Sequence, residues 1–257
     1  MSSSPNPPPS GPQVIPRPPI SRPGGPAPWA GLPAAARRDL SLERVRKAVE
    51  ERPTPPLAVS GDGTTVPSIL SLSGVEVVGT PAGVLVGLFE EKGETRVILT
   101  VRSNRLRSHT GEVAFPGGRL EPGESVDDGA RREAYEETGL DASWVEIIGH
   151  LNTMPTVSSS SLVTPVVGTL AARPTLVAEP AEVARIFDVA LADLLADGVF
   201  VEEWWTVPGR PGIGGPDGAA FPVWFFQAES ETIWGVTARV LMELLCLTLG
   251  LPVPFAA

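Results

Sequence analysis

Short apolar runs separated by polar residues divide the middle of the chain into predicted β-strands. Residues 82–89 and 96–101 are rich in aliphatic and β-branched side chains, and the polar turn at 90–94 between them predicts a hairpin. Later runs of the same kind predict further strands at 145–151, 164–170 and 223–226. This part of the chain therefore contributes strands to a sheet that buries apolar side chains.

Helical spacing of apolar residues and capping residues predict three helices. The first covers 41–49, with Ser41 as its N-cap. The second covers 126–138, because Ser125 is a suitable N-cap and Gly139 stands where a helix would end. The third is apolar and covers about 234–249. Strands mixed with helices, without a regular βαβ alternation, indicate an α+β fold with a mixed β-sheet.

Prolines and charges are distributed unevenly and divide the chain into regions. Eleven of the 29 prolines fall within the first 30 residues, which predicts a disordered tail over 1–35. A lead-in helix and linker are expected over 36–66, and the folded domain over 67–250. Residues 1–49 carry seven basic and two acidic side chains, net +5, whereas residues 50–257 carry 13 and 28, net −15.

Composition excludes several classes of function. A net charge of −10 and a pI near 4.8 disfavour contact with nucleic-acid phosphates. The single cysteine, Cys246, cannot form an intramolecular disulfide and agrees with a reducing compartment. Neither a signal peptide nor an apolar stretch long enough to cross a bilayer is visible. We therefore expect a cytoplasmic protein that binds neither nucleic acid nor membranes.

Charged side chains are most concentrated in residues 111–140, which contain eight carboxylates and three arginines. On the predicted helix, the side chains of Glu133, Glu136 and Glu137 fall within an arc of roughly 100°. Like charges on one arc repel each other, and a divalent cation would offset that repulsion. Carboxylate oxygens at this density suit Mg²⁺ or Mn²⁺. The alternative interpretation is an ordinary solvated helix face.

The spacing of seven residues argues against that alternative. They follow the pattern G(x)5E(x)7REU(x)EE(x)GU, where U is aliphatic, and Ala134 and Leu140 occupy the aliphatic positions. The segment thereby resembles the signature of the Nudix hydrolases. The fixed residues of that signature are Gly118, Glu124, Arg132, Glu133, Glu136, Glu137 and Gly139.

This resemblance implies a fold, a reaction and a set of site residues. Nudix proteins are αβα sandwiches around a mixed sheet with a catalytic loop–helix–loop, and they hydrolyse a nucleoside diphosphate linked to another moiety. Metal ligands would be Glu133, Glu136, Glu137 and the Gly118 carbonyl. Arg132 and Glu124 would hold these carboxylates in position. Glu182, outside the signature, is a candidate catalytic base or additional ligand; otherwise it is a solvated loop residue.

The segment at 99–118 resembles the one that precedes the signature in coenzyme A pyrophosphatases. Its basic side chains are Arg102, Arg105, Arg107 and His109, which would bind the phosphates of the substrate. The resemblance implies cleavage of coenzyme A or acyl-CoA to 3′,5′-ADP and (acyl-)4′-phosphopantetheine. Alternatively, the arginines pair with neighbouring carboxylates and only stabilise the fold, and His109 hydrogen-bonds its loop.

Two other functions stay open at this point. The substrate could be a different nucleoside diphosphate derivative, such as ADP-ribose or NADH. The domain could also be a catalytically silent module that binds a nucleotide or a partner protein. The intact glutamate set argues against a silent module, because binding alone does not require all three carboxylates. The sequence leaves a homodimer open as an assembly state.

Overall fold

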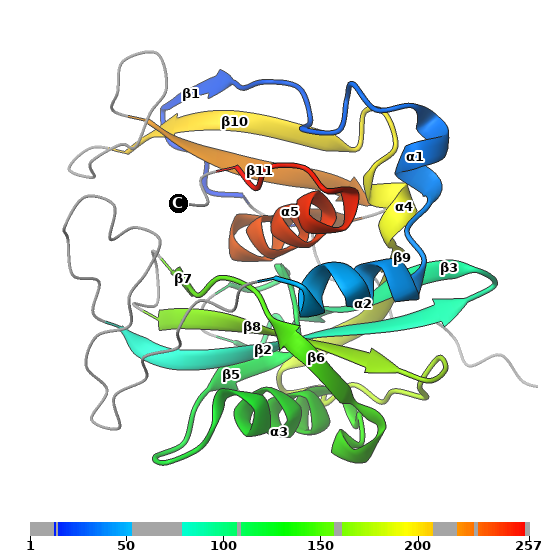
Figure 1. Ribbon diagram of the computed structural model, residues 1–257. Coiled ribbons are helices and arrows are strands. Elements are labelled where there is room, and N and C mark those ends of the chain that lie inside the picture. The colour runs from blue at the N-terminus through cyan, green and yellow to red at the C-terminus, as the bar shows by residue number, and fades with distance from the viewer. Residues whose placement is uncertain are drawn as a thin grey trace, which may run out of the picture.

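Two β-sheets and two layers of helices make up the protein (Figure 1). The structure is a computed structural model, and it describes residue 13 and the ranges 15–52, 79–106, 109–156, 161–207, 220–228 and 231–254. One helix covers the outer face of the larger sheet. Two others lie between the larger and the smaller sheet (Figure 1). The αβα sandwich expected from the resemblance is thus present, with a second sheet added to it.

The larger sheet has eight strands and is mixed, as predicted. Its central strands β2 and β8 run parallel, and the remaining pairs are antiparallel. The hairpin predicted from the polar turn is formed by β2 and β3. The strands are β2 (Thr80–Glu91), β3 (Glu94–Arg102), β4 (Val113–Ala114), β5 (Gly117–Arg119), β6 (Glu146–His150), β7 (Met154–Pro155), β8 (Ser161–Leu170) and β9 (Val183–Ala190).

The three predicted helices are present within one residue of their expected limits. Helix α3 (Val126–Thr138) covers one face of the larger sheet, whereas α2 (Leu42–Glu50) and α5 (Gly235–Leu249) pack against each other on the opposite face. Shorter helices are α1 (Ala34–Arg38), η2 (Ala142–Trp144) and α4 (Leu191–Leu194). None of the helices in the described ranges combines the length and apolar character that spanning a bilayer requires.

Helix α3 is fixed at both ends and along its inner face. The Ser125 hydroxyl accepts a hydrogen bond from the Asp128 amide at 3.1 Å, and Gly139 ends the helix with φ 67°. On β2, a Cβ added at Gly83 would lie only 2.9 Å from the carbonyl oxygen of Val126. A glycine there lets the helix backbone approach the sheet backbone closely. The carboxylates of α3 are therefore carried on a rigidly seated element.

The smaller sheet contains four antiparallel strands in the order β1-β10-β11-β12. Helix α5 packs against β11, so this sheet shares the main hydrophobic core. Of its strands, the sequence predicted only the middle of β11. The strands are β1 (Ile20–Pro23), β10 (Phe200–Thr206), β11 (Phe221–Ala228) and β12 (Glu231–Trp234).

The expectation of a disordered tail over residues 1–35 is wrong for the part that the structure describes. Strand β1 pairs with β10, and the side chain of Trp29 is 1% exposed. Its ring stacks on Phe226 and meets Phe200 edge-on, with centroid distances of 6.2 and 5.4 Å. One large aromatic side chain anchors a Pro-rich segment that has little other apolar surface to bury. Residues 1–12 lie outside the described residues.

The lead-in helix expected within 36–66 also belongs to the sandwich and is not a separate element. On α2, Val45 and Val49 are buried in the main core beside α5. The hydrophobic face of this helix therefore supplies part of the layer that covers the larger sheet. The linker expected after it, up to residue 66, and the expected start of the folded domain at 67 fall within 53–78, outside the described residues.

Replacement of Trp29 by alanine tests whether the N-terminal segment stabilises the fold. Trp29→Ala should lower the free energy of unfolding by about 3–5 kcal/mol, because it removes a buried aromatic side chain and leaves a cavity. Urea denaturation measures this change. Ile20→Ala is the control, since Ile20 is 51% exposed, and should cost less than about 1 kcal/mol. Equal stability of Trp29→Ala and the wild type would contradict the packing of this segment.

Candidate active site

Two glutamates of α3 lie against the glycine pair at the start of β5. The backbone amide of Gly117 donates a hydrogen bond to Oε2 of Glu137 at 3.2 Å. A Cβ added at Gly118 would overlap the carboxylate of Glu133. Three residues predicted to bind metal, Gly118, Glu133 and Glu137, are thus brought together. The absence of side chains at the glycine pair lets these two carboxylates approach the backbone.

Arg132 holds this acidic cluster in place by contacting several groups at once. Its Nε and Nη2 donate to the two carboxylate oxygens of Glu124 at 2.8 and 3.0 Å, the pairing that the resemblance implied. This contact holds the pKa of Glu124 below its usual value. Arg132 Nη1 also donates to Glu133 and Glu136, at 3.0 and 3.1 Å. The helical-arc argument did not predict these last two contacts.

Glu136 lies at the outer side of the cluster. Its side chain is 56% exposed and accepts a hydrogen bond from Arg132. Within the described ranges, no three acidic, histidine or cysteine side chains converge into a complete metal-ligand set. The structure therefore brings Glu133 and Glu137 to the glycine pair and leaves Glu136 beside Arg132.

Burial makes negative charge costly at the centre of the site. Glu137 is 3% exposed, and this burial raises its pKa to about 7. Burial likewise raises the pKa of Glu133, and the negative charge of Glu182 adds to the effect on both residues. The Arg102 guanidinium compensates only in part, with Nη1 4.0 Å from Oε1 of Glu137.

A divalent cation fits this donor set. The carboxylates of Glu133 and Glu137 are hard oxygen ligands in a desolvated place where opposite charge is scarce. The carbonyl of Gly118 belongs to the backbone that lies directly against Glu133. We therefore expect Glu133, Glu137 and the Gly118 carbonyl to hold the ion, with Glu136 as a further ligand.

Arg102 and Ser103 connect the end of β3 to the loop that carries Glu182. The Ser103 amide donates to the carbonyl of Glu182 at 2.8 Å, and its hydroxyl donates to the carbonyl of Pro180 at 3.2 Å. The Glu179 amide donates to the carbonyl of Glu137 at 3.0 Å. This loop is consequently held against the acidic cluster. Sequence reasoning did not single out Ser103 as a positioning residue, because its role depends on a contact 77 residues away.

The remaining predicted substrate-binding residues lie in different environments. The Arg102 side chain is 28% exposed and lies beside Glu137, and its buried Nε has no hydrogen-bond partner in the described residues. Arg105 is exposed, and Arg107 lies outside the described residues. His109 contacts Glu112, with 2.9 Å between Nδ1 and Oε2, and has a left-handed backbone at φ 59°. The loop-stabilising interpretation of His109 thus has a direct contact in its support.

The sequence is similar to a known domain family and to individual proteins. The sequence model of the NUDIX domain matches residues 79–202. The chain is 37% identical over 154 residues to "Uncharacterized Nudix hydrolase NudL" of Photorhabdus laumondii, covering 60% of this chain and 77% of that protein. It is 42% identical over 115 residues to "Nudix hydrolase 3" of Caenorhabditis elegans, covering 44% of this chain and 48% of that protein. The match thus spans about half of the latter relative.

Solved structures also match the chain. One is an Ap4A hydrolase binary complex from C. elegans, with 21% identity and a TM-score of 0.39. The alignment covers 44% of this chain and 82% of that one.

The close approach at Gly118 can be tested by adding a single methyl group. Gly118→Ala should push the Glu133 carboxylate aside and weaken Mn²⁺ binding roughly 10- to 100-fold, because ligand orientation controls affinity. Electron paramagnetic resonance of free Mn²⁺ gives the affinity. Gly31→Ala is the matched control, since a Cβ there meets nothing within 4 Å. Wild-type Mn²⁺ affinity in Gly118→Ala would show that this contact does not shape the site.

Proposed function

The chain belongs to the Nudix hydrolase family, and from that premise we propose that it hydrolyses the diphosphate bond of coenzyme A or acyl-CoA. The products would be 3′,5′-ADP and (acyl-)4′-phosphopantetheine. One observation carries the diphosphate part of the proposal: the guanidinium of Arg102, the first arginine of the upstream segment, lies 4.0 Å from the buried carboxylate of Glu137, and this side chain is 28% exposed. The coenzyme A part rests on the resemblance of the upstream segment. A guanidinium in this position suits a phosphate group next to a metal-binding cluster.

Each residue of the site would have its own role in diphosphate hydrolysis. When bound, Mg²⁺ or Mn²⁺ would offset the charge on the phosphate oxygens and lower the pKa of a water molecule. Glu133, Glu136, Glu137 and Gly118 would hold the ions, and Arg132 with Glu124 would keep these carboxylates oriented. Arg102 would donate to a diphosphate oxygen. Glu182, beside the cluster, would accept the proton of the attacking water.

Two alternatives differ from this proposal in substrate or in activity. The acidic cluster with its metal ions and Arg102 would bind the diphosphate of any nucleoside diphosphate derivative. ADP-ribose and NADH are therefore the competing substrates. A silent binding module is disfavoured, because burying Glu133 and Glu137 costs free energy that nucleotide binding alone would not require. Cytoplasmic location and dimerisation stay predictions.

Loss of one carboxylate charge tests the metal-dependent reaction. Glu137→Gln keeps the side-chain shape but removes a ligand charge, and it should lower kcat by roughly 10²-fold or more. The fold should survive, because the substitution removes a charge that burial disfavours. Steady-state hydrolysis of coenzyme A with Mg²⁺ and with Mn²⁺, together with thermal unfolding, measures both effects.

Glu121→Gln is the matched control for this experiment. Glu121 is an exposed glutamate in the loop before α3, so the same chemical change there should leave kcat within about twofold of the wild type. Wild-type turnover in Glu137→Gln would refute the proposed role of the cluster. Activity in the wild type that is independent of divalent cations would refute it as well.

The arginines of the upstream segment should separate coenzyme A from dephospho-CoA, which lacks the 3′-phosphate. Because Arg102 lies beside the diphosphate-binding cluster, Arg102→Ala should reduce kcat/KM for both substrates. Arg105→Ala or Arg107→Ala should instead reduce kcat/KM for coenzyme A roughly 10- to 150-fold and change it little for dephospho-CoA. The measurement is kcat/KM for both substrates across the three variants.

A substrate panel decides between the proposal and its alternative. It should include coenzyme A, acyl-CoA, ADP-ribose, NADH and diadenosine polyphosphates. The proposal requires coenzyme A or acyl-CoA to have the highest kcat/KM. Preference for ADP-ribose, with no arginine variant distinguishing coenzyme A from dephospho-CoA, would leave a Nudix hydrolase with another substrate.

A further inference from the structure

Helix α5 contacts the strand that leads into the glycine pair through the side chain of Thr237. The hydroxyl of Thr237, in the first turn of α5, donates a hydrogen bond to the carbonyl oxygen of Val113 on β4 at 2.9 Å. These two residues are 124 positions apart in the sequence, and both are buried. The NUDIX sequence model matches residues 79–202, so Thr237 lies outside it.

The carbonyl of Val113 needs this donor because of its direction in the strand. Successive carbonyls of a β-strand point to opposite sides. The carbonyl of Glu112, one residue earlier, accepts a hydrogen bond from the amide of Arg102 on β3 at 2.9 Å. The carbonyl of Val113 therefore points away from β3, the only strand that pairs with β4 in the described residues. A buried carbonyl without a donor is costly, and Thr237 supplies the donor.

The residues between β4 and the glycine pair are themselves held in place. Phe115 is 4% exposed and packs in the main hydrophobic core, to which α5 contributes. The carbonyl of Pro116 accepts a hydrogen bond from the amide of Leu85 on β2 at 2.8 Å. The next amide, that of Gly117, donates to the carboxylate of Glu137. Because this segment is short and each of its residues is bonded or buried, a shift of β4 would be carried to that carboxylate.

We propose that Thr237 is a positioning residue for the metal site. Its hydroxyl holds the edge of β4 that faces away from β3, and β4 sets the position of the glycine pair against Glu133 and Glu137. This role rests on the proposed function as far as metal binding is concerned, whereas the contact between Gly117 and Glu137 requires no ion. Residues beyond the matched domain thereby contribute to the geometry of the site.

Two substitutions at Thr237 separate the effect of its hydroxyl from that of its methyl group. Thr237→Val keeps the shape of the side chain and removes the donor, whereas Thr237→Ser keeps the donor and removes the methyl group. Thr248→Val is the matched control on the same helix. Thr248 is 4% exposed, and its hydroxyl donates to the carbonyl of Leu244 within α5 at 2.8 Å. This control removes a buried hydrogen bond of the same kind without a change at β4.

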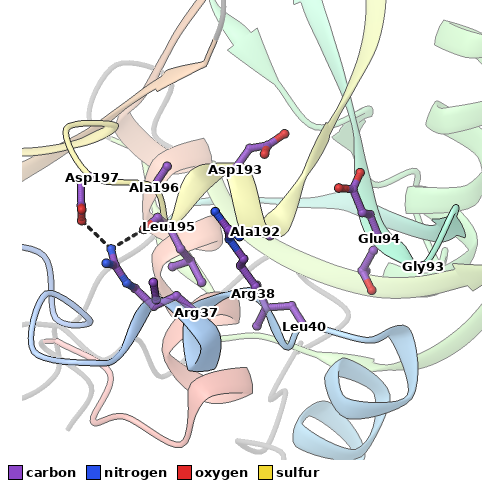
Figure 2. Close-up of a pocket in the computed structure, with 12 residues that line it drawn as sticks. Arg37, Arg38, Leu40, Gly93, Glu94, Ala192, Asp193, Leu195, Ala196 and Asp197 are labelled. Carbon is purple, nitrogen blue, oxygen red and sulfur yellow. Dashed lines mark hydrogen bonds and ion pairs between the residues drawn. The ribbon is translucent and has the colours of Figure 1, made fainter.

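Hydrogen exchange of the metal-free full chain, followed by ¹⁵N NMR, measures the first effect. In Thr237→Val the amide of Gly117 should exchange roughly 3- to 10-fold faster, because a hydrogen bond that restrains β4 is lost. Thr237→Ser and Thr248→Val should keep the wild-type rate. The amide of Leu195 is the internal reference and should not change. It donates to the carbonyl of Ala192 in the wall of the cavity between α1, α4 and the β2–β3 turn (Figure 2), at the other end of β3 from the acidic cluster.

Mn²⁺ affinity, measured by electron paramagnetic resonance of the free ion, gives the second effect. Thr237→Val should bind Mn²⁺ roughly 3- to 10-fold more weakly than the wild type, because the orientation of the ligands depends on the residues that support them. Thr237→Ser and Thr248→Val should stay within about twofold of the wild type.

The outcomes distinguish this role from a general contribution to stability. Wild-type exchange at Gly117 in Thr237→Val would overturn the positioning role, and so would equal losses in Thr237→Val and Thr248→Val. Faster exchange in Thr237→Ser would overturn it as well, and this variant decides the matter if Thr237→Val does not fold. A wild-type chain that binds no Mn²⁺ would overturn the proposed function, and the exchange rates would still decide whether Thr237 positions Gly117.

Discussion

The close contact between the backbone of β5 and the acidic face of α3 is the constraint on which the candidate site depends. Glu133 can lie over Gly118 because no side chain intervenes, and Glu137 is held by the amide of Gly117. On β2, Gly83 brings the start of the same helix against the sheet. The helix is thus seated by backbone approach, which leaves little freedom for the carboxylates it carries.

This seating places like charges in a desolvated position within an acidic protein. Residues 50–257 carry a net charge of −15, and yet two carboxylates of α3 are buried together with Glu182 nearby. Arg132 binds the carboxylate of Glu133, and Nη1 of Arg102 lies 4.0 Å from Oε1 of Glu137. The excess of negative charge that these arginines leave uncompensated favours a bound cation. A bound cation would in turn attract the negative oxygens of a diphosphate toward the cluster, beside Arg102.

Local features of the fold could be predicted because their causes lie within a few residues. The limits of α3 follow from the Ser125 cap and Gly139, and the β2–β3 hairpin follows from its polar turn. The placement of Gly118, Glu133 and Glu137 at one site agrees with the spacing of the signature. The hydrogen bond from Arg132 to Glu124 also agrees with that signature.

Other features depend on contacts between distant parts of the chain and were missed. Strand β9 was not predicted, because its partner β3 lies 81 to 94 residues earlier in the sequence. The smaller sheet pairs residues 20–23 with 203–206, and a Pro-rich composition gives no sign of such pairing. The burial of Trp29 likewise depends on Phe200 and Phe226. The Pro-rich composition of this segment does not show that it packs against the folded domain.

Anomalous X-ray diffraction from crystals grown with Mn²⁺ would test the central claim most directly. The claim is that the glycine pair and the carboxylates of α3 form one metal-binding site. It predicts an anomalous peak within bonding distance of the carboxylates of Glu133 and Glu137, on the side of the Gly118 carbonyl. A Mn²⁺ peak elsewhere in the protein, with none at these residues, would contradict the claim.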